Sequence, residues 1–100
     1  MKSISAMDLF QIIQRKEGCL LIDVREVFEH YNFNIGGQNI PMSEIFENIQ
    51  RLSTEQPIIM YCQKGIRSAI VIQRLEEKFG FTNLINLSGG VDAWRKDIKD

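Results

Sequence analysis

The chain has few residues that could cross-link it or hold a metal ion. Its 100 residues include two cysteines, Cys19 and Cys62, which lie far apart and form no Cys-x-x-Cys pair. Two such cysteines are too few for the disulfide framework of a small secreted protein. With a single histidine, His30, the sequence also lacks the clustered ligands of a tetrahedral zinc site. We therefore expect neither a disulfide framework nor a metal or other cofactor.

The chain also lacks an excess of charge and any long hydrophobic run. It carries 12 basic and 13 acidic residues, a net charge of −1, which gives no reason to expect nucleic acid or an anionic membrane as partner. No apolar run approaches the roughly 20 residues of a membrane span. Asp8 comes too early for the apolar region of a secretory leader. We expect a cytoplasmic protein, although the sequence leaves open whether it was cut from a longer or exported chain.

The pattern along the chain predicts an α/β fold. The length suits one domain, residues 1–100, and a composition of 44% hydrophobic and 25% charged residues is typical of globular proteins. Short apolar runs alternate with amphipathic helical segments, which indicates a mostly parallel sheet covered on both faces. The strands are expected at residues 19–24, 39–40, 58–61 and 84–87.

Capping and turn residues predict where the helices begin and end. Ser5 can cap a first helix, with Asp8 in capping-box spacing, and Gly18 can end it in the left-handed conformation. A short helical turn is expected at 26–31, and Ser43 begins a helix whose inward side chains are Ile45, Phe46, Ile49 and Leu52. A further helix spans 67–79, and a last one follows Gly89 and Gly90 and packs Trp94 on the sheet.

The segment Ile58–Ser68 carries the strongest chemical signal. Cys62 stands at the end of a buried strand, and the chain enters a helix at Arg67, with Lys64 and Gly65 between them. Gly65 allows a sharp turn that points successive N–H groups inward, and such a nest of N–H groups binds an anion. The helix N-terminus and the two basic residues add positive potential. These features favour a reactive thiolate over the simpler interpretation of Cys62 as a small buried hydrophobe.

Four stretches in order resemble the rhodanese-like domain family over about 75 residues. They are Leu21-Ile22-Asp23-Val24-Arg25-Glu26 with Glu29, Ile35-x-Gly37-x-Asn39-Ile40-Pro41, Ile58-Ile59-Met60-Tyr61-Cys62-x-x-Gly65-x-Arg67-Ser68, and Asn86-Leu87-x-Gly89-Gly90 with Trp94. One stretch departs from the pattern, since Phe33-Asn34-Ile35-Gly36-Gly37-Gln38 stands where members often have Gly-His-Ile-x-Gly-Ala. The resemblance implies a three-layer α/β/α domain with a five-stranded, mostly parallel sheet.

The resemblance also implies the site. Cys62 is expected to be the catalytic residue and to carry sulfur as a persulfide. The residues expected to bind the substrate are Gln63, Lys64, Gly65, Ile66, Arg67 and Ser68. Asp23 and Arg25 are expected to support this loop, because sulfur transfer to a stable thiolate needs no strong general base.

Several side chains have alternatives that the sequence leaves open. Arg67 can face the bound anion or pair with a carboxylate such as Glu29, and Arg25 can pair with Asp23, Glu26 or Glu29 or line the pocket entrance. We expect Lys64 to face solvent at the mouth and steer anionic donors. His30 is expected to be a surface helix residue and Cys19 a core residue.

The expected function is a sulfurtransferase that moves sulfur from thiosulfate or a persulfide to a thiol or cyanide. A protein-to-protein sulfur relay and a non-catalytic rhodanese-type interaction module are the alternatives. A phosphatase of similar fold is disfavoured, since such enzymes have five residues between cysteine and arginine, and here Gln63–Ile66 supply four.

Overall fold

The computed structural model describes residues 1–98. Five strands of this part of the chain form one parallel sheet. The strands are β1 (Lys2–Ile4), β2 (Leu20–Asp23), β3 (Gln38–Asn39), β4 (Ile58–Tyr61) and β5 (Leu84–Leu87), in the order β1-β5-β4-β2-β3. Every paired neighbour runs parallel. The expected α/β fold is confirmed, and all five strands end at the same edge of the sheet.

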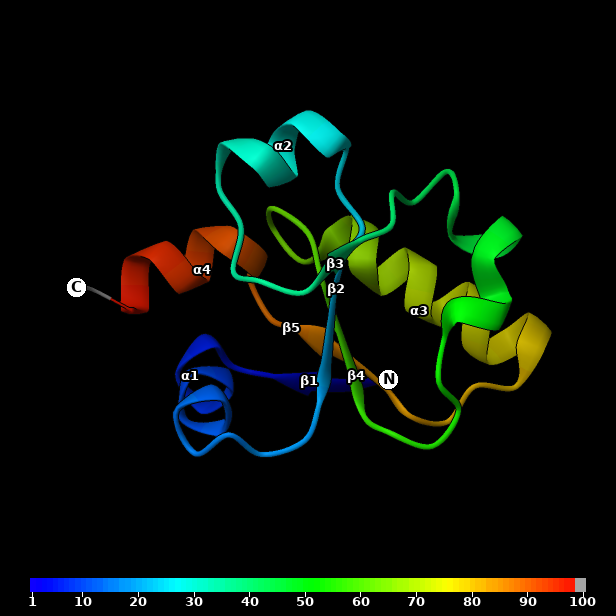
Figure 1. Ribbon diagram of the computed structural model, residues 1–100, viewed down its shortest axis with the longest axis horizontal. Helices are drawn as coiled ribbons and strands as arrows, with labels where there is room; N and C mark the ends of the chain where they lie inside the picture. The colour runs from blue at the N-terminus through cyan, green and yellow to red at the C-terminus, as the bar shows by residue number, and fades with distance from the viewer. Residues whose placement is uncertain (99–100) are drawn as a thin grey trace.

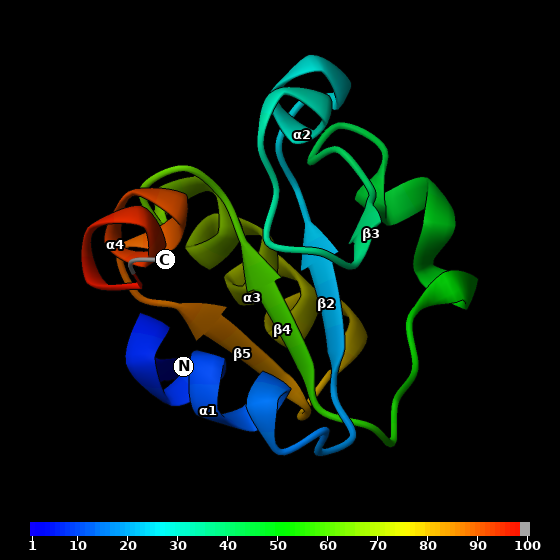
Figure 2. The same ribbon diagram turned by 60° about the vertical axis from the view of Figure 1, so that its left-hand side comes forward.

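Helices cover both faces of the sheet, and a further helix lies beyond its carboxyl edge. α1 (Ala6–Gln14) and α4 (Gly90–Asp97) lie on one face, while α3 (Ile66–Phe79) and the 3-10 segment η1 (Ile45–Arg51) lie on the other (Figures 1 and 2). α2 (Val27–Asn32) stands where β2 points (Figure 2). Among the described residues, no helix has both the length and the hydrophobicity to cross a membrane.

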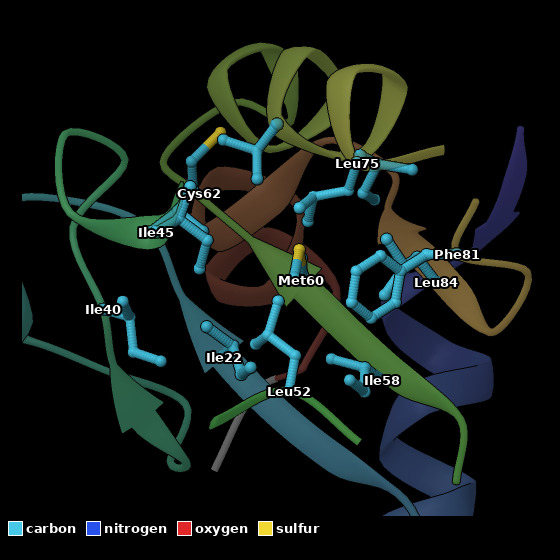
Figure 3. Packing of buried hydrophobic residues seen from close by; sticks show 13 residues of the cluster. Ile22, Ile40, Ile45, Leu52, Ile58, Met60, Cys62, Leu75, Phe81 and Leu84 are labelled. Carbon is cyan, nitrogen blue, oxygen red and sulfur yellow. The ribbon is translucent and has the colours of Figure 1, made fainter. Parts of the chain in front are cut away.

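Two apolar clusters, one on each face, hold the layers together. The larger packs Val71, Ile72 and Leu75 of α3 against the sheet, and Figure 3 shows Cys62 within this cluster. The smaller includes Leu9 of α1, Val91 of α4 and Tyr61 of β4. Because β4 contributes to both clusters and all four of its residues are buried, it is the central strand that positions whatever follows it.

The end of α1 differs from the prediction. Gly18 was expected to take the left-handed conformation, but Lys16 does so, with φ 56°. The Lys16 N–H donates to the Ile13 carbonyl and the Glu17 N–H to the Ile12 carbonyl, which is the bonding of a Schellman motif. These two bonds satisfy the last carbonyls of the helix two residues before the glycine.

The prediction was wrong about one further segment and missed another. The helix expected from Ser43 is instead a pair of short 3-10 turns, broken at Asn48 (φ −120°). The Asn48 side-chain amide donates to the Glu44 carbonyl, and so competes with the backbone bond that an α-helix would make there. The edge strand β1 was not expected, because three residues with two exposed side chains show no hydrophobic pattern.

Candidate active site

Cys62 follows β4 directly and is held on both sides by backbone hydrogen bonds. The Val24 N–H donates to the Tyr61 carbonyl at 3.0 Å, and the Val91 N–H donates to the Cys62 carbonyl at 2.9 Å. The cysteine is 1% exposed. Its sulfur atom is therefore fixed between β2 and the start of α4, at the carboxyl edge where parallel sheets bind ligands.

The loop after Cys62 turns its N–H groups toward the sulfur. The Gly65 N–H lies 3.1 Å from Cys62 Sγ and the Ser68 N–H 3.4 Å from it. Gly65 precedes α3 with φ 87°, a conformation that side-chain-bearing residues rarely adopt. Two N–H donors and the N-terminus of a 14-residue helix thus point at the sulfur, the arrangement of an anion-binding nest. We call these two N–H groups and the start of α3 the cradle.

A buried polar chain continues from the sulfur to β5. Ser68 Oγ lies 3.4 Å from Cys62 Sγ and donates to Asn86 Oδ1 at 2.5 Å. Asn86 Nδ2 donates to the Gly65 carbonyl, which fixes the amide so that Oδ1 faces Ser68. Because Ser68 has one hydroxyl proton, the thiol must donate to Ser68 Oγ, whereas the thiolate can receive that proton instead. Ser68 and Asn86 thus adapt to either form of the sulfur.

The start of α4 is hydrogen-bonded to the same loop. The Asp92 N–H donates to the Gln63 carbonyl at 3.0 Å, and Gln63 Nε2 donates to Asp92 Oδ1 at 2.6 Å. Gly90 makes this approach possible, because a Cβ there would stand 2.3 Å from the Cys62 carbonyl oxygen. A side chain at Gly90 would therefore push α4 away from the loop.

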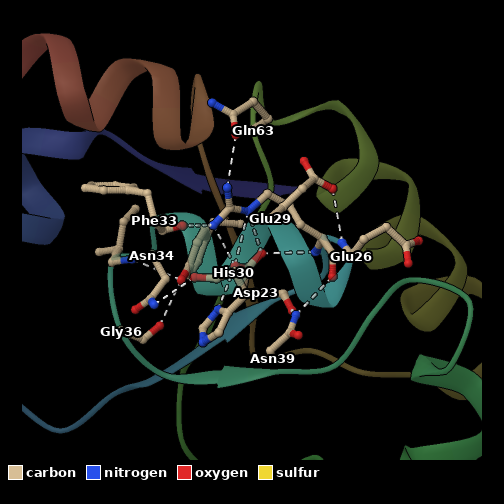
Figure 4. A network of polar contacts seen from close by, with 12 residues as sticks. Asp23, Glu26, Glu29, His30, Phe33, Asn34, Gly36, Asn39 and Gln63 are labelled. Atoms are coloured by element: carbon tan, nitrogen blue, oxygen red, sulfur yellow. Dashed lines mark hydrogen bonds and ion pairs between the residues drawn. The ribbon is translucent and has the colours of Figure 1, made fainter.

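Asp23, at the end of β2, anchors a second network beside the loop (Figure 4). It is fully buried, and its carboxylate accepts from the Arg25 backbone N–H and from Arg25 Nε and Nη2. Burial lowers the pKa of Arg25, but the hydrogen bonds and charge of Asp23 outweigh it and leave the pKa raised. Arg25 Nη1 then donates to Gln63 Oε1 at 3.0 Å. Of the alternatives for Arg25, the structure has the pair with Asp23 and a direct bond to the loop, and Arg25 also lines a cavity beside the loop.

His30 was expected at the surface, and this is wrong. Its side chain is 14% exposed, and Nδ1 lies 2.9 Å from Asp23 Oδ2. The reason is that Asp23 needs partners for all its lone pairs once it is buried, and α2 brings His30 within reach.

Arg67 pairs with Glu29 of α2 and does not face the sulfur. Its Nη1 and Nη2 donate to the two Glu29 oxygens at 2.9 and 3.0 Å. The Arg67 hydrogen bond holds the pKa of Glu29 below its ordinary value, and burial offsets this in part. Arg67 and Glu29 form the wall of a cavity of about 410 Å³ over the loop, with Gln63, Lys64 and Ile66. Lys64 is exposed at this mouth.

Cys19 lies at the other end of the sheet. It precedes β2, whose first residue, Leu20, pairs with Ile58 at the start of β4. Both cysteines are free thiols. Burial raises the pKa of the Cys19 thiol, and the nearby charge of Glu17 adds to the rise. The two thiols therefore stand at opposite ends of neighbouring strands.

The model of the rhodanese-like domain family matches residues 7–97 of the chain. The chain belongs to this family. A rhodanese-like domain protein from Staphylococcus aureus has the same fold, with a TM-score of 0.86 and 29% identity over the whole of both chains.

Two curated relatives show the range of this rhodanese-like family. The chain is 40% identical over 80 residues to the uncharacterized protein YqhL of Bacillus subtilis, covering 79% of the chain and 63% of YqhL. It is 27% identical over 95 residues to the thiosulfate sulfurtransferase GlpE of Coxiella burnetii, covering 94% of the chain and 87% of GlpE. The relatives of this rhodanese-like chain thus include a thiosulfate sulfurtransferase. The chain spans less than two thirds of the length of YqhL.

The rhodanese-like domain departs from its family pattern at residues 33–38, and the structure shows how that segment is held. The Tyr61 hydroxyl accepts from the Ile35 N–H and donates to the Gly36 carbonyl. Burial, with the charge of Asp23, raises the pKa of Tyr61 to about 12, so it remains a donor at neutral pH. Asn34, at the position of the family histidine, donates to the His30 carbonyl.

Sequence reasoning missed Asn86 and Asp92 as neighbours of the loop, and His30 as a partner of Asp23. Asn86 had a detectable signal, because a polar residue within the apolar strand Leu84–Leu87 needs a buried partner, as Asp23 does in β2. Asp92 and His30 had no such signal, since polar residues are common in helices that cover a sheet. Their contacts depend on how α2 and α4 dock on the loop.

Proposed function

We propose that this protein is a sulfurtransferase in which Cys62 carries a sulfane sulfur. The observation that supports it is the cradle, in which two backbone N–H groups and the start of α3 face a buried Cys62 sulfur. Such donors suit an anion on sulfur, whether the thiolate or the outer sulfur of a persulfide. The donor is thiosulfate or another persulfide, and the acceptor is a thiol or cyanide.

The reaction proceeds in two balanced displacements. The Cys62 thiolate attacks the outer sulfur of thiosulfate; a Cys62–sulfur bond forms, and the sulfur–sulfur bond of thiosulfate breaks with its electron pair leaving on sulfite. A nucleophilic acceptor then attacks the outer sulfur of the persulfide. The new bond gives thiocyanate from cyanide or a persulfide from a thiol, and the electron pair returns to Cys62. No step requires an added oxidant, reductant or metal.

The loop residues divide between holding the sulfur and admitting the reactants. Gly65 and Ser68 supply the N–H donors to the sulfur. Gln63, Lys64, Ile66 and Arg67 border the mouth through which the donor arrives. Asp23 and Arg25 act on the loop through Gln63, because Arg25 links Gln63 to the buried Asp23 carboxylate.

Two expectations follow from this chemistry. Cys62 must be reduced to attack, and a compartment such as the cytoplasm keeps thiols reduced. The reactants are small anions or nucleophiles, so neither nucleic acid nor a membrane is needed as a partner.

Steady-state formation of thiocyanate from thiosulfate and cyanide tests the proposal. Wild-type protein should turn over, Cys62→Ser should lose at least about a thousandfold in kcat, and the matched Cys19→Ser variant should retain activity. Turnover by Cys62→Ser at the wild-type rate would refute the proposal.

A further inference from the structure

A second concavity adjoins the mouth of the loop. It has a volume of about 430 Å³, and Gln63 and Glu29 line both it and the mouth cavity. Its other walls include Phe28 and Phe33 on the α2 side and Arg95 of α4. Figure 4 shows Phe33 and Gln63 at the border of the Asp23 network, on the side where α4 lies. The two cavities are therefore neighbours that share Gln63 and Glu29 as wall residues.

Together the two cavities offer more space than the smallest reactants need. Thiosulfate and cyanide are compact, and the mouth cavity of about 410 Å³ alone would accommodate either. Phe28 is 72% exposed, although burial of an aromatic ring is favourable. An exposed ring in the wall of a cavity next to the mouth of the loop provides a surface for the carbon body of a larger reactant.

Besides Arg25 and Glu29, the charged side chain that lines this second cavity is that of Arg95. Its guanidinium carbon lies 4.7 Å from the centre of the Phe33 ring, which holds the cation against the wall. Within residues 1–98 no carboxylate forms an ion pair with Arg95. The charge of Arg25, by contrast, is matched by Asp23, and that of Arg67 by Glu29. Arg95 is thus the wall group suited to receive an anion.

We propose that the cavity bounded by Phe28, Phe33 and Arg95 is a subsite for the sulfur acceptor, and that the acceptor is a small thiol carrying a carboxylate. The inference rests on the proposed function. The carboxylate pairs with Arg95, the carbon body lies on the two rings, and the thiolate reaches past Gln63 to the persulfide. There the acceptor sulfur bonds to the outer sulfur, and the bond to Cys62 breaks with its electron pair returning to Cys62.

Gln63 lines both cavities and is held in place. Its amide is held between Arg25 Nη1 and Asp92 Oδ1, at 3.0 and 2.6 Å, so it cannot swing into the mouth without losing both bonds. A thiol bound at Arg95 consequently approaches along a fixed wall, which orients it for attack.

Matched acceptors test the subsite. With thiosulfate as donor, kcat/KM is measured for mercaptopropionate and for mercaptopropanol, which has a hydroxymethyl group in place of the carboxylate, with rates corrected for the fraction of thiolate. Wild-type protein should prefer the carboxylate by about threefold to tenfold, the range of a charge-assisted contact at a partly exposed site. Arg95→Gln should reduce this ratio to about one, and Arg95→Lys should retain part of it.

Lys96→Gln is the control, because it removes a neighbouring exposed charge of α4 that does not line the cavity, and it should leave the ratio unchanged. A wild-type ratio near one, or an equal fall in Lys96→Gln, would overturn the subsite. Cyanide separates this outcome from failure of the proposed function: turnover with cyanide but no preference for the carboxylate contradicts only the subsite, whereas no turnover with any acceptor contradicts the sulfurtransferase.

Discussion

Cys62 and Cys19 carry the same side chain beside neighbouring strands, Cys62 after β4 and Cys19 before β2, yet their surroundings differ. At the carboxyl edge, two N–H groups and the start of α3 face the Cys62 sulfur. At the amino edge, burial and Glu17 disfavour the anion of Cys19. A parallel sheet creates this difference, because the helix that follows each strand begins at the carboxyl edge and points its N–H groups there.

The two edges also differ in how their polar groups are bound. The carboxyl edge has a buried network that ties Asp23, Arg25 and Gln63 to α4. Near the amino edge, the ion pair of Arg15 and Glu17 has both side chains more than half exposed. Buried polar groups fix a geometry and are costly to break, whereas exposed pairs contribute little. Replacing the same type of residue at the two edges should therefore change stability or activity by unequal amounts.

The largest difference is expected at the arginines. Arg25→Ala leaves the Asp23 carboxylate buried without its main partner and should lower the free energy of unfolding by about 3–5 kcal/mol. Arg15→Ala, which removes an exposed pair, should change it little. Urea denaturation of both variants measures this, and equal losses would contradict the contrast between the edges.

The next largest difference is expected between Ser68, beside the Cys62 sulfur, and Ser53, in a turn before β4. Ser68→Ala removes the donor to Asn86 Oδ1 and should lower the free energy of unfolding by about 1–3 kcal/mol and kcat by about tenfold, while the backbone N–H to the sulfur remains. Ser53→Ala removes a hydroxyl from a turn that precedes β4, and should leave kcat unchanged. Denaturation and thiocyanate formation by both variants check this. An unchanged kcat in Ser68→Ala would show that the hydroxyl does not serve the sulfur.

Particular elements show how far the sequence could predict this arrangement. The strands of residues 58–61 and 84–87, the loop that begins at Cys62 and the end of α3 at Phe79 follow from local patterns, and the structure confirms their positions. The contacts of His30 and the break at Asn48 could not be deduced, and the sequence left open whether Arg67 faces the anion or pairs with Glu29. Each depends on a side chain that reaches a group on another turn or element, and periodicity carries no information about such distances.

A smaller effect is expected from the exposed lysine at the mouth. Lys64→Ala should lower kcat/KM for thiosulfate by about twofold to fivefold at low salt, with less effect on kcat, because an exposed charge contributes mainly to capture of the anion. The loss should shrink as salt rises and screens charges over about 10 Å at 0.1 M. Lys78→Ala, at the far end of α3, is the control. Steady-state kinetics at two salt concentrations decide this, and equal behaviour of the two variants would argue against steering by Lys64.

The smallest effect concerns the pair of Glu29 and Arg67. The folded pKa of Glu29 lies below its unfolded value, so its contribution to stability is present above the unfolded pKa and is lost as the pH falls through the folded pKa. Since Arg67 is partly exposed, we expect Glu29→Gln to cost about 0.5–1 kcal/mol at neutral pH. Denaturation at several pH values should show this difference vanish in acid. A cost that persists at the lowest pH would mean that the charge of Glu29 is not its source.

Mapping the transferred sulfur tests the central claim most directly. Wild-type protein is incubated with thiosulfate, and each cysteine-containing peptide is then weighed by mass spectrometry. A persulfide formed by covalent catalysis adds one sulfur, about 32 Da, and we predict it on the peptide of Cys62 and not on that of Cys19. An added sulfur on Cys19 alone, or equally on both cysteines, would contradict the account.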